Sequence, residues 1–195
     1  MVIDENINDN QDKVVNEDSK TYQIFIIGEV NAEMSKEIIR TLFEIDWKQD
    51  NVTNLNVYIS SEGGFLSDCF AMIDAFQFIK DTFNVHISTF GLGECASAGF
   101  FLFLLGDTRI LFPNCVVFVH EHLTVSSEST YSDIKRENKH SKTLYEMYVK
   151  YTSIRLGLST TKIKNLLKRN RYLTCAELSK FNIITHKCNE IELDV

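Results

Sequence analysis

Residues 91–105, GLGECASAGFFLFLL, place a lone hydroxyl, that of Ser97, between two alanines at the start of an apolar run. Small flanking residues permit a tight turn from a strand into a helix, and such a turn lifts a side chain clear of its neighbours. A nucleophilic serine is usually presented in this way. An ordinary helix N-cap has the same local sequence, and this stretch alone favours the N-cap.

The sequence before this stretch alternates between strand and helix patterns. Short β-rich runs predict strands at YQIFIIGEV (22–30), LNVYIS (55–60) and NVHISTF (84–90). Apolar residues at helical spacing predict a helix after each of the first two strands. Their stripes are Met34, Ile38, Leu42 and Ile45, and then Phe70, Ile73, Phe76 and Ile79. This alternation predicts an α/β domain with a largely parallel sheet.

The remaining sequence predicts shorter elements around one long helix. TRILF (108–112) and CVVFV (115–119) are expected strands, and NEIELDV (189–195) is expected to close the chain as another. The segment 123–157 turns from polar to amphipathic, and its helix is expected to stop at Gly157. We expect this segment to project from the domain or to pack against a partner.

Composition and charge restrict the class of protein. The chain has 195 residues, which suits one domain with a substantial core. Residues 1–20 lack hydrophobic periodicity and predict a flexible acidic tail, so the domain is expected to span 21–195. The net charge of −7 argues against nucleic acid and anionic membranes as main partners. No segment reaches the roughly 18 apolar residues that cross a bilayer.

The five cysteines are scattered, odd in number and form no CxxC pair. This usage favours buried free thiols in a reducing compartment over a disulfide framework or a zinc site, and the expected location is the cytoplasm.

Three elements could carry chemistry together. Ser97 stands where backbone N–H groups at a helix start would favour a developing oxyanion. Gly63-Gly64 follows a strand and can bring the backbone close to a ligand. His120 ends an apolar strand, at the edge where sites in α/β folds gather. A serine nucleophile needs such a base, and the base needs a third group that fixes its tautomer.

Each element also has a simpler interpretation. The glycine pair alone is typical of a plain turn, and His120 alone is typical of a half-buried histidine. His120 and His122 could share a metal, but no third ligand is evident. Cys95 could replace Ser97 as the nucleophile, but no basic residue beside it would lower the pKa of its thiol.

Taken together, five segments resemble the proteolytic subunit of the Clp protease. The resemblance covers about residues 21–186 and is specific because the segments keep the family's order and near-family spacing. They are GEVNAEMSKEIIRTLF (28–43), VYISSEGGFLSDCFAMIDAFQFIK (57–80), GECASAGFFLFLLG (93–106), PNCVVFVHEHL (113–123) and RNRYLTCAELSKFNIIT (169–185). The resemblance implies a Clp/crotonase-like α/β fold with repeated β-β-α units and a protruding handle helix in about 123–157.

The resemblance also implies roles for individual residues. Ser97 matches the family's nucleophile and His120 its histidine, seven residues after the Pro-Asn pair. Gly64 and Ala98 match the residues whose backbone N–H groups form the oxyanion hole. Asn170 occupies the place of the third triad member, which is an aspartate in the family. No cofactor or metal is implied.

Several positions depart from the family pattern. An asparagine carbonyl can still accept the imidazole N–H, but Asn170 brings no charge for the imidazolium. Glu62 replaces a proline and puts a carboxylate near the cleft. EHLTVSSEST (121–130) lacks the proline and glycines of the strand that receives substrate in the family, so substrate handling can differ. Residues 1–20 do not resemble the family's axial loops, which bears on docking to a ring-shaped ATPase unfoldase.

The leading hypothesis is therefore a serine endopeptidase that cleaves unfolded proteins or peptides through an acyl-enzyme on Ser97. We expect stacked seven-membered rings, as a homo- or hetero-oligomer. Four tyrosines of the long helix predict an interface, with packing onto the chain's own core as the alternative; they are Tyr131, Tyr145, Tyr148 and Tyr151. One alternative function is a weakly active or inactive subunit that acts as a structural partner in a mixed complex. A second is a crotonase-fold enzyme acting on acyl-CoA thioesters.

Overall fold

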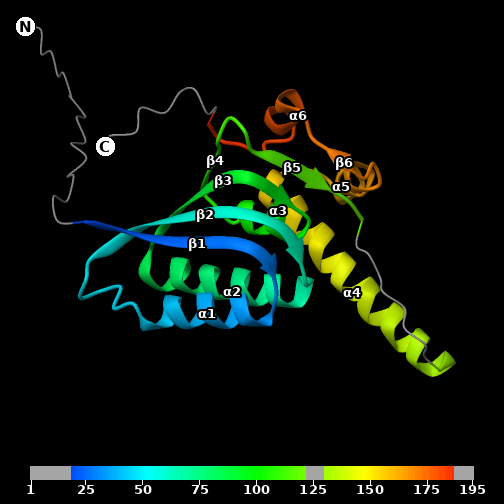
Figure 1. Ribbon diagram of the computed structural model, residues 1–195, viewed down its shortest axis with the longest axis horizontal. Coiled ribbons are helices and arrows are strands. Elements are labelled where there is room, and N and C mark those ends of the chain that lie inside the picture. Colours follow the sequence, from blue (N-terminus) through cyan, green and yellow to red (C-terminus); the bar gives the residue numbers. More distant parts are fainter. Residues whose placement is uncertain (1–18, 122–129, 187–195) are drawn as a thin grey trace, which may run out of the picture.

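The structure, a computed structural model, describes residues 19–121 and 130–186 (Figure 1). The expected strand at 189–195 and all but the end of the expected tail lie outside the described residues. Strands and helices alternate in the first half of the chain, as the sequence patterns predict. The elements are β1 (Lys20–Val30), α1 (Ala32–Glu44), β2 (Val52–Gly64), α2 (Leu66–Phe83), β3 (His86–Ala96), α3 (Ala98–Phe103), β4 (Thr108–Leu111), β5 (Val116–Val119), α4 (Tyr131–Leu156), α5 (Thr160–Leu167), β6 (Arg171–Tyr172) and α6 (Cys175–Lys180).

One sheet organises the fold. Its strands run in the order β1-β2-β3-β5-β6, with β4 paired to β3, and all neighbours are parallel except β5 and β6. Helices α1 and α2 lie side by side against one face of β1 and β2 (Figure 1). The strand residues that face them are buried because they alternate with outward residues along each strand. Examples are Ile24, Ile26, Leu55, Val57 and Ile59.

Each long strand is divided into two segments at the same level of the sheet. The register shifts between Ile27 and Glu29 in β1 and between Ile59 and Ser61 in β2. In β3, residues 88–91 pair with β4, whereas residues 94–96 pair with β5. Each of the three units is therefore two strand segments followed by a helix, as the Clp/crotonase-like fold requires. The bends carry the second segments away from the main sheet and gather their ends.

Helix α3 is the centre of the core. Every residue of the run Phe100–Leu105 is at most 2% exposed. A helix that is apolar on all sides must be surrounded by other elements, and α3 contacts β2, β3, β5 and α2. The segment that decides the fold is thus enclosed, and its first residues are held rigidly.

Helix α4 extends away from the rest of the fold at its N-terminal end (Figure 1). Thr130 caps that end through Asp133, and Gly157, at a φ of +64°, ends the helix as the sequence predicts. The C-terminal half packs on the body, where Tyr148 and Val149 are buried. The prediction that the tyrosine face is an interface is therefore wrong for Tyr148, and Tyr151 also packs against the core. A tyrosine ring can be buried when its hydroxyl donates a hydrogen bond to a carbonyl oxygen, as the hydroxyls of Tyr148 and Tyr151 both do.

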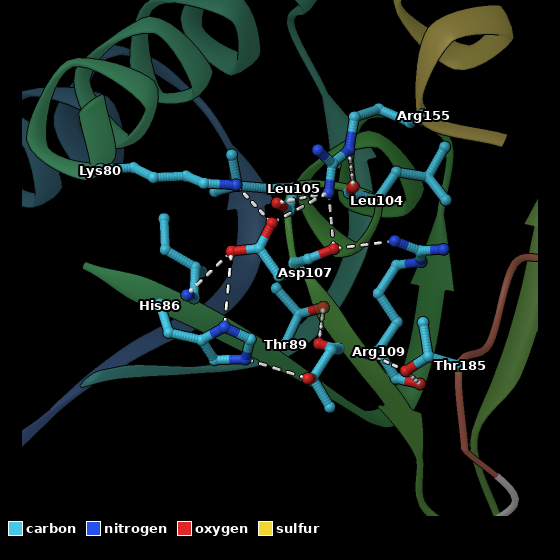
Figure 2. A network of polar contacts seen from close by, with 12 residues as sticks. Lys80, His86, Thr89, Leu104, Leu105, Asp107, Arg109, Arg155 and Thr185 are labelled. Atoms are coloured by element: carbon cyan, nitrogen blue, oxygen red, sulfur yellow. Dashed lines mark hydrogen bonds and ion pairs between the residues drawn. The ribbon is translucent and has the colours of Figure 1, made fainter. Parts of the chain in front are cut away.

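A polar network around Asp107 fixes this packing (Figure 2). Asp107, just after α3, accepts hydrogen bonds from the Lys80 ammonium of α2 and, at 3.2 Å, from the Ile87 N–H. Arg155 of α4 donates to the carbonyl oxygens of Leu104, Leu105 and Gly106. These contacts clamp α2, α3 and α4 together.

Candidate active site

Ser97 occupies the turn between β3 and α3 in a conformation that few residues adopt. Its φ is +51° and its ψ is −120°, and its side chain makes no capping hydrogen bond to α3. Ser97 therefore stands at the N-cap position of α3, but its hydroxyl does not cap the helix as the N-cap interpretation expected. A non-glycine residue in this region of φ/ψ costs about 1–3 kcal/mol, and such strain is concentrated at functional sites. The strain presents the hydroxyl instead of burying it.

Gly63 and Gly99 let the end of β2 and the Ser97 turn approach each other backbone to backbone. A Cβ added at Gly63 would lie 2.6 Å from the Ser97 Cβ and 2.9 Å from the Ala98 nitrogen. A Cβ at Gly99 would lie 2.7 Å from the Ser61 carbonyl oxygen. Any larger residue at either position would push the two segments apart. Gly64 brings β2 close to β1 instead, since a Cβ there would lie 2.1 Å from the Val30 carbonyl oxygen.

The two residues expected to supply N–H donors lie at the ends of neighbouring elements. Gly64 is the last residue of β2 and pairs with Val30 of β1, and the next residue, Phe65, donates its N–H to the Val30 carbonyl over 2.8 Å. Ala98 is the first residue of α3, where N–H groups have no partner within the helix.

His120 reaches the same place from β5. The Ser97 N–H donates to the Phe118 carbonyl over 3.1 Å, and His120 follows two residues later. Tyr148 donates its hydroxyl to the His120 carbonyl over 2.9 Å, which holds the end of the strand against α4. The Nδ1 atom of His120 lies 2.5 Å from the Glu121 carbonyl. With the proton on Nδ1, Nε2 is free to act as a base.

Asn170 precedes β6 and is not among the described residues that line the cavity. The antiparallel register pairs Phe118 with Tyr172 and Val119 with Arg171, and it ends one residue before Asn170 and His120 are reached. Asn170 has a φ of +45°, and its side chain is exposed. Within residues 19–121 and 130–186, no hydrogen bond joins Asn170 to His120, and none joins the Ser97 hydroxyl to the His120 ring. Hydrogen bonds of catalytic groups are often incomplete without substrate.

A cavity of about 650 Å³ contains Ser97, His120 and Gly64 among its lining residues. One wall comes from the ends of β1 and β2 and the start of α2. Another wall is one face of α4, whose lining residues recur at helical spacing. These residues are Glu137, His140, Ser141, Leu144 and Tyr148. The sequence predicts a handle at this helix but does not predict this wall, although the spacing of its residues contains the signal.

Cys95, two residues before Ser97 in the sequence, is poorly suited to act as a nucleophile. A side-chain hydrogen bond with Cys115 and burial together raise the pKa of the Cys95 thiol well above its ordinary value. A thiol that stays protonated is a poor nucleophile. Within the described ranges, no group of three or more His, Cys, Asp or Glu side chains could hold a metal ion. No helix among those residues is long and apolar enough to cross a membrane.

The fold and this cavity define a mixed α/β protein of the Clp/crotonase-like class. A sequence model of the Clp protease family matches residues 6–189. The match covers nearly the whole chain, and the protein belongs to the Clp protease family. It is a Clp-like protease subunit, and membership implies an oligomeric ring assembly.

Proposed function

We propose that this protein is a serine-type endopeptidase that cleaves unfolded proteins or peptides through an acyl-enzyme on Ser97. The observation that carries the proposal is the strained, uncapped Ser97 turn in a cavity that also contains His120. Neither a structural N-cap nor a core serine would need that conformation.

The proposed reaction assigns one task to each group. The Ser97 Oγ attacks the carbonyl carbon of the scissile peptide while Nε2 of His120 takes the hydroxyl proton. The Gly64 and Ala98 N–H groups hold the oxyanion of the tetrahedral intermediate. His120 returns the proton to the leaving nitrogen as the C–N bond breaks, and water then hydrolyses the acyl-enzyme by the same route.

Asn170 is the proposed acceptor for the Nδ1 proton of His120, and the pairing of the adjacent residues Arg171 and Val119 supports this proposal. The Glu121 carbonyl is the competing acceptor, because it lies 2.5 Å from Nδ1. Either oxygen would keep Nε2 unprotonated, and neither carries a charge. We therefore propose a slow peptidase.

Assembly into stacked seven-membered rings is part of the proposal. The face of β1 and β2 opposite α1 and α2 exposes Phe25 and Ile27 to 58% and 56%. Phe25, Tyr58 and Phe90 stack across three strands with ring centroids 5.1 and 4.9 Å apart. Exposed apolar side chains such as Phe25 and Ile27, at the open end of this ladder, are typical of a protein interface. A second copy of this chain is the proposed occupant, and a ring-shaped ATPase unfoldase is the proposed further partner.

The test is covalent labelling with a fluorophosphonate combined with a peptidase assay and a native mass measurement. Ser97→Ala should abolish labelling and cleavage and keep the assembly, whereas Cys95→Ala should keep both activities. Labelling that survives Ser97→Ala would overturn the assignment of the nucleophile. An assembled but unlabelled parent protein would instead identify a structural partner subunit. Hydrolysis of acyl-CoA thioesters in preference to peptides would identify the crotonase-type activity.

A further inference from the structure

The cavity that contains Ser97 is lined by carboxylates from three elements, β1, β2 and α4. Glu29 and Glu62 lie on the neighbouring strands β1 and β2, where Glu29 pairs with Gly63, and both side chains are exposed. Glu137 lines the cavity from α4. No lysine or arginine is among the described residues that line this cavity.

These three carboxylates have no cationic partner within the part of the chain that the structure describes. The ion pairs formed there include none of Glu29, Glu62 and Glu137. Two basic residues that flank Glu137 in α4 are engaged elsewhere, because Arg136 pairs with Asp133 and Lys142 pairs with Glu146. No lysine or arginine of the described residues therefore pairs with these carboxylates to neutralise the negative potential inside the cavity.

The arrangement also indicates the shape of the cation that would fit. The three carboxylates form no described group that could hold a single metal ion. Between them, the cavity presents apolar surface from Phe65, Leu66, Phe101 and Leu144. Lysine and arginine combine an aliphatic stem with a charged end, and they bury the stem along apolar surface while the charge stays near water.

We infer that Glu29, Glu62 and Glu137 select polypeptide segments with lysine or arginine next to the scissile bond. This inference rests on the proposed function, because it names the substrate class of the Ser97 site. The carboxylates bind the cationic ends, and the apolar residues between them contact the stems. A glutamate in the same segment is rejected because like charges meet in a partly enclosed cavity.

The first experiment compares fluorogenic peptides that differ at one position on either side of the scissile bond, at pH 8 and low salt. The position carries lysine, arginine, norleucine, glutamine or glutamate. We expect kcat/KM for lysine or arginine to exceed that for norleucine or glutamine by about tenfold, with glutamate lowest. The preference should shrink as salt is added, because ions screen the carboxylates.

Variants assign the preference to its residues. Glu62→Gln, Glu29→Gln and Glu137→Gln should each lower the preference for lysine over norleucine about threefold, mainly through KM for the lysine peptide. Glu37→Gln is the matched control: Glu37 is an exposed carboxylate of α1 outside the cavity. It removes the same charge from the chain and should leave the preference unchanged. A Glu37→Gln effect as large as the others would overturn the local assignment.

A binding measurement separates this inference from the proposed function. Labelled lysine-containing and glutamate-containing peptides are titrated against the Ser97→Ala protein, and anisotropy reports binding without turnover. Tighter binding of the lysine peptide supports the inference even where the parent protein cleaves nothing. Ser97-dependent cleavage with equal rates for lysine, norleucine and glutamate would overturn the inference and leave the proposed function intact. Equal binding of both peptides to Ser97→Ala would also overturn it.

Discussion

Arg171 of β6 pairs with Val119 of β5, the residue that precedes His120. Asn170 comes immediately before Arg171 and turns the chain there at a φ of +45°. The left-handed conformation suits asparagine better than most residues. Asn170 thus serves the turn into β6.

The first prediction concerns Asn170, the proposed hydrogen-bond partner of His120. We expect Asn170→Asp to raise kcat/KM by about 10- to 100-fold, because a carboxylate stabilises the imidazolium that forms during attack. Arg171 pairs with Glu177, and the pair lowers the pKa of Glu177 to about 2, so Arg171 is already engaged. Arg169 joins no ion pair within the described residues and is the flanking cation left to favour the new charge.

Asn170→Ala completes this test, with labelling rate and native mass measured alongside cleavage. A loss of activity with intact assembly supports Asn170 as the group that orients His120. If Asn170→Ala and Asn170→Asp both match the parent, Asn170 has no part in the mechanism, and the Glu121 carbonyl is the orienting group.

A second prediction concerns the approach of β2 to the nucleophile turn. Gly63→Ala should abolish labelling of Ser97, because the new Cβ would meet the Ser97 Cβ at 2.6 Å. Gly28→Ala is the control: Gly28 has a similar φ of +94°, but a Cβ there meets nothing within 4 Å. Both variants should lose about 1–3 kcal/mol of stability from backbone strain, and only Gly63→Ala should lose labelling. Equal labelling of the two variants would contradict the proposed role of the close approach.

A third prediction tests Tyr148 as a positioning residue. Tyr148→Phe removes the hydroxyl that donates to the His120 carbonyl, so we expect a several-fold lower kcat and a small change in KM. Tyr151→Phe is the matched control, because the Tyr151 hydroxyl donates to the Phe101 carbonyl over 3.1 Å and not to His120. Both should cost about 1 kcal/mol in unfolding free energy. A kcat that falls equally in both variants would point to general loosening of α4.

The fourth prediction concerns the polar network around Asp107. Burial by itself raises the pKa of Asp107, but hydrogen bonds from Lys80 and the Ile87 N–H outweigh it and hold the pKa below its ordinary value. Asp107→Asn should cost about 1–3 kcal/mol of unfolding free energy at pH 7. A lowered pKa contributes stability that is present above the unfolded value, near pH 4, and is lost as pH falls through the folded value.

Urea unfolding of parent and variant at pH 7, 5 and 3, at one protein concentration, checks this expectation. The difference should persist at pH 5 and shrink at pH 3. Asp81→Asn is the control, because Asp81 is exposed on the same helix as Lys80 and should change stability by less than about 0.5 kcal/mol. A difference that stays constant down to pH 3 would mean that the charge of Asp107 is not what stabilises the network.

The fold and part of the site could be predicted from local sequence. The strand and helix patterns up to residue 105 reappear as β1 through α3, and Gly157 ends α4 at a positive φ as expected. The structure gathers Ser97, His120 and Gly64 in one cavity. Periodicity and turn chemistry determine such features because each depends on residues a few positions apart.

Other features depend on contacts between distant residues. Nothing in the local pattern distinguished Ser97 as an N-cap from Ser97 as a strained turn, because the choice depends on how closely Gly63 packs against it. The burial of Tyr148 and the place of Glu137 on the cavity wall depend on where α4 docks.

The sequence by itself determined the α/β class, the order of the elements and the family to which the residues point. Tertiary structure alone decided the conformation of Ser97 and the charge of the cavity walls. It also decided that the Glu121 carbonyl lies next to Nδ1 of His120. The physical reason is range: helix and strand preferences act within a few residues, whereas a site is made where segments far apart in the chain are packed together.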